Sequence, residues 1–165
     1  MSSPQFLGVH SATIDPEGRI QLPVQLRDEV NLRSPEFRFM ASLEADGSIC
    51  LRSREGFDRW TERLRSAEPC SQDARRTLLT VAAFSAPVKC DKQGRIRVPD
   101  PILRLAGIER SDAREVVLVG GFDEIRVWSP RGWDAFAAHA RDGLSAGLDE
   151  LLLGASADGL SAAEA

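Results

Sequence analysis

The feature that most constrains this sequence is a short stretch that occurs twice. Residues 15–23 (DPEGRIQLP) and 91–99 (DKQGRIRVP) share Asp, Gly, Arg, Ile and Pro at matching positions. Every shared residue is displaced by the same 76 positions, as from Asp15 to Asp91. A constant displacement without gaps indicates an internal duplication, which limits the chain to folds built from two equivalent units.

Each copy predicts a tight β-hairpin. An Asp at the first turn position (Asp15, Asp91) and a Gly at the fourth (Gly18, Gly94) fit a type I turn followed by a left-handed residue. Glycine adopts the positive φ of that last position at little cost. The sequence therefore predicts that Asp and Gly support the turn in both copies.

After each turn, apolar and polar residues alternate, which is typical of a half-buried strand. If Ile20 and Ile96 point inward, then Arg19, Arg95 and Arg97 point outward. The Asp four residues before Arg19 or Arg95 can accept hydrogen bonds from the turn backbone and from the guanidinium. Each hairpin is thus predicted to display an arginine that an aspartate holds in place.

The displacement continues past the hairpins, as in Ile49/Ile125, Ser53/Ser129 and Gly56/Gly132. Periodicity and turn residues predict strands at 6–14, 19–22, 37–43, 49–52, 86–90, 95–98, 115–120 and 125–128. Helices are predicted over 24–30, from Ser53 to Ser66, from Ser71 or Asp73 onward, from Asp100 to Gly107, and from Ser129 onward. The fold class is therefore α+β, with two tandem β-β-α-β-β-α repeats.

We expect three segments: a first repeat over 6–82, a second over 84–141, and an acidic, unordered tail over 142–165 in which Leu148–Leu153 could make one helical turn. The net charge is −4, from 21 basic and 25 acidic residues. Five of the acidic residues and none of the basic ones follow Arg141, so the remainder carries +1. The low overall charge therefore does not exclude an anionic partner, provided that cations cluster.

Nothing in the sequence indicates catalysis or a metal site. Cys50, Cys70 and Cys90 form no CxxC pair, and His10 and His139 do not correspond between the copies. We therefore predict no enzyme activity, no cofactor and no small-molecule substrate. With no membrane-spanning run or signal peptide in the sequence, we expect a cytoplasmic protein.

A single hairpin of this kind is most simply explained as an ordinary solvated turn. Two copies that keep Arg while their outward neighbours change favour a use for the guanidinium, and Arg suits phosphate and bidentate base recognition. Two alternatives stay open: a ring-forming protein scaffold whose arginines pair with acidic side chains, and an enzyme of unknown type.

The doubled motif resembles the MraZ family of bacterial transcriptional regulators, which have two tandem SpoVT-AbrB-like domains. The resemblance rests on residues 8–10 (GVH), both hairpins and residues 115–120 (EVVLVG), and covers roughly residues 6–141. It implies a swapped-hairpin, AbrB-like β-barrel of double-psi type with flanking helices, and subunits assembled into a ring. It also implies DNA binding at promoter direct repeats, typically upstream of the division and cell-wall genes, and association with the nucleoid.

Carried over to this chain, the resemblance makes Arg19 and Arg95 the DNA-contacting residues and Asp15 and Asp91 their supports. The family commonly has a basic residue within the turn. The second copy has Lys92 there and adds Arg97, whereas the first copy has Glu17 in its turn and Gln21 at the position of Arg97. The second hairpin is therefore expected to contribute more to DNA binding.

Overall fold

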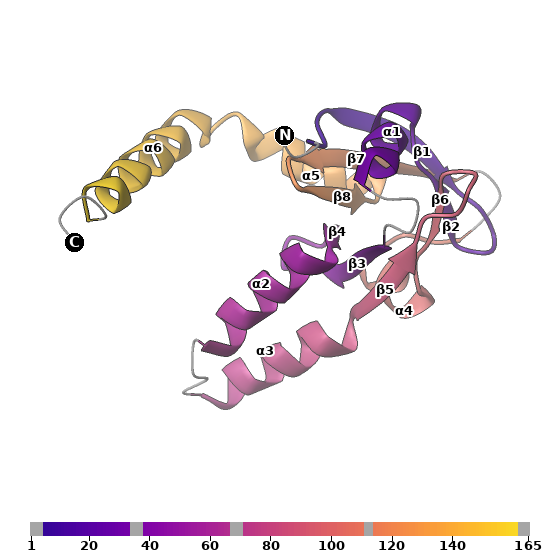
Figure 1. The fold of residues 1–165 in the computed structure, drawn as a ribbon. Coiled ribbons are helices and arrows are strands. Elements are labelled where there is room, and N and C mark those ends of the chain that lie inside the picture. Colours follow the sequence, from indigo (N-terminus) through magenta and orange to yellow (C-terminus); the bar gives the residue numbers. More distant parts are fainter. Residues whose placement is uncertain (1–4, 34–37, 67–70, 111–113, 162–165) are drawn as a thin grey trace. The chain divides into compact units, whose positions relative to one another are not determined.

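The computed structural model describes residues 5–33, 38–66, 71–110 and 114–161, which form two compact units, residues 1–132 and 133–165 (Figure 1). Its strands are β1 (Val9–Ile14), β2 (Arg19–Gln21), β3 (Arg38–Leu43), β4 (Ile49–Ser53), β5 (Ser85–Lys89), β6 (Arg95–Arg97), β7 (Arg114–Gly121) and β8 (Glu124–Trp128). Its helices are α1 (Val24–Arg33), α2 (Arg54–Ser66), α3 (Gln72–Ala83), α4 (Asp100–Leu105), α5 (Pro130–Ala140) and α6 (Leu144–Ser161). The α+β class is confirmed.

All eight strands belong to one antiparallel sheet with the order β5-β3-β4-β8-β7-β1-β2-β6. The two end strands, β5 and β6, follow one another in sequence and are joined by the bridge Cys90–Ile96, so the sheet is a nearly closed barrel. The strands of the two halves interleave. The β1–β2 hairpin lies between β7 and β6, and the β3–β4 pair lies between β5 and β8.

The strand register relates the two halves of the barrel to one another by an approximate twofold symmetry. Ile20 pairs with Ile96, and Cys50 pairs with Arg126, so at both places a residue faces its own counterpart 76 positions away. The prediction of a gap-free displacement is wrong in one strand. Leu51 pairs with Ala41, whereas its counterpart Val127 pairs with Leu118, which lies 77 positions after Ala41. The equivalent pairs Leu43–Ile49 and Gly120–Ile125 enclose five residues and four residues, respectively, and this one-residue difference restores the register.

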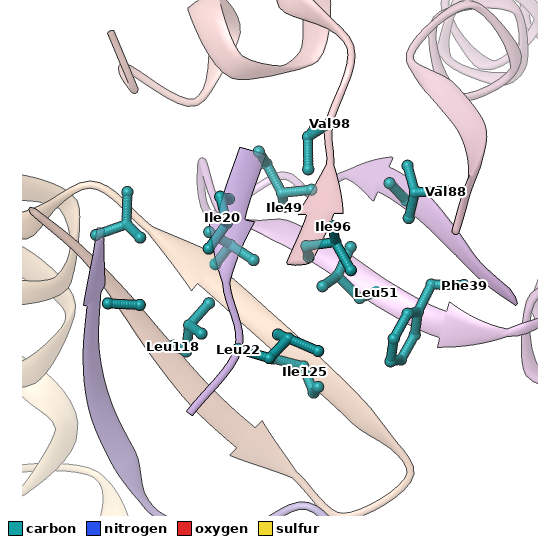
Figure 2. Close-up of a cluster of buried hydrophobic side chains, with 14 of the residues drawn as sticks. Ile20, Leu22, Phe39, Ile49, Leu51, Val88, Ile96, Val98, Leu118 and Ile125 are labelled. Carbon is teal, nitrogen blue, oxygen red and sulfur yellow. The ribbon is translucent and has the colours of Figure 1, made fainter. Parts of the chain in front are cut away.

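The core lies inside this barrel and receives side chains from both halves. Figure 2 shows ten labelled members of the cluster: Ile20, Leu22, Phe39, Ile49, Leu51, Val88, Ile96, Val98, Leu118 and Ile125. Ile20 and Ile96 are fully buried, as the alternation predicted. Because each half leaves its apolar strand faces to be covered by the other, neither repeat can bury its core alone.

A buried polar network crosses β3, β4 and β8. Arg52, only 9% exposed, donates a hydrogen bond to Glu44 at 2.7 Å and forms an ion pair with Glu124 at 3.0 Å. Its carbon Cζ lies 4.5 Å from the centre of the Trp60 ring, which ties α2 to the sheet. Removing Arg52 would leave Glu124 paired with Arg126 alone, and breaking a buried ion pair costs about 3–5 kcal/mol. Cys50 is fully buried beside this network, and burial raises the pKa of its thiol.

The helix boundaries follow the capping residues of the sequence. The hydroxyl oxygens of Ser53, Ser71 and Ser129 accept the backbone N–H groups of residues 56, 74 and 132, respectively. Gly107, with φ of 67°, follows α4 as predicted. The predicted break at Ser66–Pro69 begins at the last residue of α2 and otherwise lies outside the described residues, as does Cys70.

The acidic C-terminal segment differs from the expected unordered tail, because the structure has helix α6 over Leu144–Ser161. Its Ala, Leu and Glu residues favour helix, whereas its three glycines do not. In chain order α6 follows α5 as α3 follows α2, so each repeat ends in two helices rather than one. The expected boundaries of the repeats and the tail, at 6–82, 84–141 and 142–165, remain a prediction.

Candidate nucleic-acid interface

The first hairpin consists of β1, β2 and the turn Asp15–Arg19. Asp15 accepts the backbone N–H of Gly18 at its carbonyl, and Gly18 has φ of 77°, so the turn has the predicted type I geometry with a left-handed glycine. The carboxylate oxygen Oδ1 of Asp15 accepts the backbone N–H groups of Glu17 at 3.0 Å and Arg19 at 2.8 Å. Its Oδ2 accepts a hydrogen bond from Nε of Arg19 at 2.6 Å. One carboxylate thus fixes both the turn and the guanidinium.

The second hairpin, formed by β5, β6 and the turn Asp91–Arg95, repeats this arrangement. Oδ1 of Asp91 accepts the backbone N–H groups of Gln93 and Arg95, both at 2.9 Å. Oδ2 accepts Nε of Arg95 at 2.9 Å, and Gly94 has the same φ of 77°. The Asp and Gly residues therefore lie where the sequence predicted, in both copies.

Pairing between β2 and β6 brings the two hairpins together. Arg19 lies opposite Arg97, and Gln21 lies opposite Arg95. Directly opposite residues of an antiparallel pair point to the same side of the sheet, and the Ile20–Ile96 pair between them points into the core. The four polar side chains therefore share one outward surface, which we call the hairpin face.

Hydrogen bonds across the pair fix one hairpin against the other. The backbone N–H of Leu22 donates to the Gly94 carbonyl at 2.8 Å, and that of Val98 donates to the Gly18 carbonyl at 3.3 Å. The side-chain amide of Gln21 also donates to the carbonyl of Gln93 at 3.0 Å. The first copy thus supports the turn of the second, a contact that depends on strand pairing and was missed from the sequence.

The two hairpins differ in charge. Nη2 of Arg19 donates to Glu17 at 3.0 Å in addition to the bond with Asp15, so two carboxylates neutralise this guanidinium. Lys92 and Arg97 make no ion pair with any described residue, and Arg95 pairs with Asp91 alone. Residues 15–21 contain two carboxylates and one arginine, a formal charge of −1, whereas residues 91–97 contain one carboxylate and three cations, a charge of +2.

Both arginines of the motif stay accessible despite their pairing. The side chains of Arg19 and Arg95 are 36% and 32% exposed. Desolvation by itself would raise the pKa values of the Asp15 and Asp91 carboxyls. Hydrogen bonds from the backbone and the guanidinium of Arg19 and Arg95 outweigh that effect, so both pKa values are lowered. The same contact with Asp15 raises the pKa of Arg19. Charged carboxylates therefore hold each guanidinium while leaving part of it to solvent.

Two further arginines lie beside the turns and were missed by the sequence reasoning. A Cβ built on Gly94 would lie 2.4 Å from Cδ of Arg27, and one on Gly18 would lie 3.0 Å from Cδ of Arg110. Each turn glycine is thus covered by an arginine stem from the opposite half of the chain. Arg27 and Arg110 do not correspond in the duplication, so the repeat pattern could not have revealed them.

Fold and site together define a duplicated, interleaved β-barrel protein with a basic hairpin face. The model of a family described as "MraZ protein, putative antitoxin-like" matches residues 85–154, which include the second hairpin. A Micrococcus luteus protein named "Transcriptional regulator MraZ" is 28% identical over 161 residues, covering 90% of this chain and 98% of the relative. A Mesoplasma florum protein of the same name is 27% identical over 131 residues, covering 79% and 84%.

The Mycolicibacterium smegmatis protein of that name is 26% identical over 147 residues, covering 89% of this chain and 96% of the relative. These relatives align along most of the chain, and the family model matches the second repeat. The chain is therefore similar to proteins of the MraZ family along most of its length. Among the helices that the structure describes, none has the length and apolarity needed to cross a membrane.

Proposed function

We propose that this protein is a sequence-specific DNA-binding regulator of transcription. The observation that supports the proposal best is the β2–β6 register, which puts Arg19, Arg95 and Arg97 on one outward face. Lys92 lies in the adjoining turn. The names of the relatives agree with a regulator. Phosphate contacts would supply most of the affinity, and arginine–guanine contacts would supply sequence preference.

The family resemblance and the paired hairpins lead us to propose further details. The DNA sites would be direct repeats close to the promoter of the division and cell-wall gene cluster. A ring of subunits would present several hairpin faces to the repeats, so that contacts of modest affinity add through avidity. The interleaved strand order supports placing the barrel in the AbrB-like, swapped-hairpin class. We place the protein in the cytoplasm, on the nucleoid.

The decisive experiment is the double substitution Arg19→Ala/Arg95→Ala. Both guanidinium groups are partly exposed, so the substitutions leave the buried core intact. We expect promoter DNA to be no longer retarded in a mobility-shift assay, while the elution volume in gel filtration stays that of the wild type. Unchanged retardation would refute the proposal.

The alternative is a ring-forming scaffold for another protein. Exposed leucines on α6, such as Leu151 at 72% and Leu152 at 67%, are the observation in its favour. A scaffold would keep its complexes when competitor DNA is added. Competition with unlabelled promoter DNA therefore separates the two functions.

A further inference from the structure

Arg27, on α1, lies against the second hairpin although it belongs to the first repeat. Its Cγ and Cδ atoms would be 3.2 Å and 2.4 Å from a Cβ built on Gly94. The absence of a side chain at Gly94 thus makes room for the Arg27 stem. Pro23 accepts the backbone N–H of Arg27 at 2.9 Å, so the first turn of α1 fixes where that stem begins.

The Arg27 guanidinium is free to bind a ligand. Among the described residues it has no hydrogen-bond or ion-pair partner. Its nitrogen atoms are also not among the buried side-chain atoms of the described residues that lack a partner, so they remain accessible to solvent. The positive charge of Arg27 also acts on Cys90, which directly precedes the second turn. Burial raises the pKa of the Cys90 thiol, and the charge of Arg27 opposes that rise.

Arg110 provides a matched contrast. Its stem lies against Gly18 of the first turn in a similar way, but its guanidinium is bound to the Asp100 carboxylate. A cation that already has a carboxylate partner gains less from a phosphate than one that has none. The two arginines therefore occupy comparable places beside the two turns and differ in whether their charge is available.

We propose that Arg27 binds a phosphate of the DNA backbone, extending the basic hairpin face from Lys92, Arg95 and Arg97 onto α1. A planar guanidinium can donate two parallel hydrogen bonds to phosphate oxygens. The four cations surround one turn that contains a single carboxylate, Asp91, so this side of the face carries a formal charge of +3. The inference rests on the proposed function, because it names one more residue of the same interface.

The test is the salt dependence of DNA binding in the full-length protein carrying Arg27→Met. Methionine keeps an unbranched apolar stem over Gly94 and removes the charge. Each phosphate contact contributes about 0.9 to the slope of log K against log salt concentration. We expect Arg27→Met to lower the slope by about one for each subunit that contacts the DNA. Arg27→Lys should retain most of it.

Arg110→Met is the matched control, and its slope should equal that of the wild type. A slope unchanged in Arg27→Met overturns the inference, and so does an equal loss in both methionine variants. If Arg27→Met lowers the affinity at every salt concentration without changing the slope, its role is structural and the inference is again wrong. Wild-type protein that does not bind promoter DNA at all would instead refute the proposed function.

Discussion

The two hairpins have the same backbone and opposite charge. Asp15 and Asp91 make equivalent hydrogen bonds, and both turn glycines have φ of 77°. Yet the formal charge is −1 over residues 15–21 and +2 over residues 91–97. The comparison shows that turn geometry depends on the shared Asp and Gly, whereas the electrostatic contribution depends on positions that the duplication has not kept.

The pairing of β2 with β6 brings these two differently charged hairpins side by side. Arg19 lies directly opposite Arg97, and like charges at such positions repel one another. The second carboxylate on Arg19, from Glu17, offsets that repulsion, while Arg97 has no described partner. The first hairpin is therefore compensated within the protein, whereas in the second Lys92 and Arg97 have no carboxylate partner among the described residues.

The largest expected effect comes from removing the arginines one at a time. Arg95→Ala should weaken promoter binding about tenfold or more, because a bidentate arginine contact is worth about 1–3 kcal/mol. Arg19→Ala should weaken it by no more than about threefold, since two carboxylates already hold that guanidinium. Titrations followed by fluorescence anisotropy at one salt concentration would measure both dissociation constants.

Gel filtration of both variants serves as the control for assembly, because a lost ring would weaken binding through avidity alone. Equal losses for the two variants would contradict the role assigned to Glu17. A larger loss for Arg19→Ala would reverse the comparison between the hairpins.

A smaller effect is expected from changing Glu17 itself. Glu17→Gln removes the ion pair with the outer nitrogen of Arg19 together with one negative charge, and we expect affinity to rise about fivefold, in line with ~1 kcal/mol for one charge in water. Glu17→Lys adds a cation where the second copy has its own turn lysine, Lys92, and should also raise the salt slope by about one per contacting subunit. The same anisotropy titrations, repeated over a range of salt, measure both quantities.

The pair of variants separates two effects. If only Glu17→Lys strengthens binding, then the pairing of Arg19 with Glu17 does not limit the first hairpin, and a new cation merely adds a contact. If neither variant changes the affinity, the first hairpin lies away from the DNA.

Local structure could be predicted because it depends on local residues. The Asp and Gly of each hairpin specified the turn, the alternation around Ile20 and Ile96 specified the buried face, and Ser53 specified a helix start. The contacts between copies could not be predicted. The Gln21 bond to the second turn and the Arg27 stem on Gly94 both depend on β2–β6 pairing, which no periodicity reveals.

The tail shows a different limit. Composition favoured an unordered segment because it consists mainly of Gly, Ala, Ser, Leu and acidic residues. The structure has α6 there, and a helix-forming run around Leu148–Leu153 is consistent with it. Composition averages over a segment, so it did not show where a helical run begins or ends.

The smallest expected effect is a pH dependence that should be alike in the two hairpins. The pKa values of Asp15 and Asp91 are both lowered from the usual 3.8 in the folded state. A carboxyl with a lowered folded-state pKa stabilises the fold above its unfolded pKa, and the contribution is lost as pH falls through the folded value. Asp15→Asn and Asp91→Asn should therefore lower the urea midpoint at neutral pH, and each difference from wild type should shrink below about pH 4.

Asparagine can still accept the two backbone N–H groups of the turn, so the variants remove the charge and keep most of the backbone support. Similar shifts for both would show that the hairpins are equivalent in stability and differ only toward DNA. A difference from wild type that stays constant down to about pH 3 would mean that the carboxylate charge does not stabilise the turn. A shift in one variant alone would mean that the hairpins differ in stability as well as in charge.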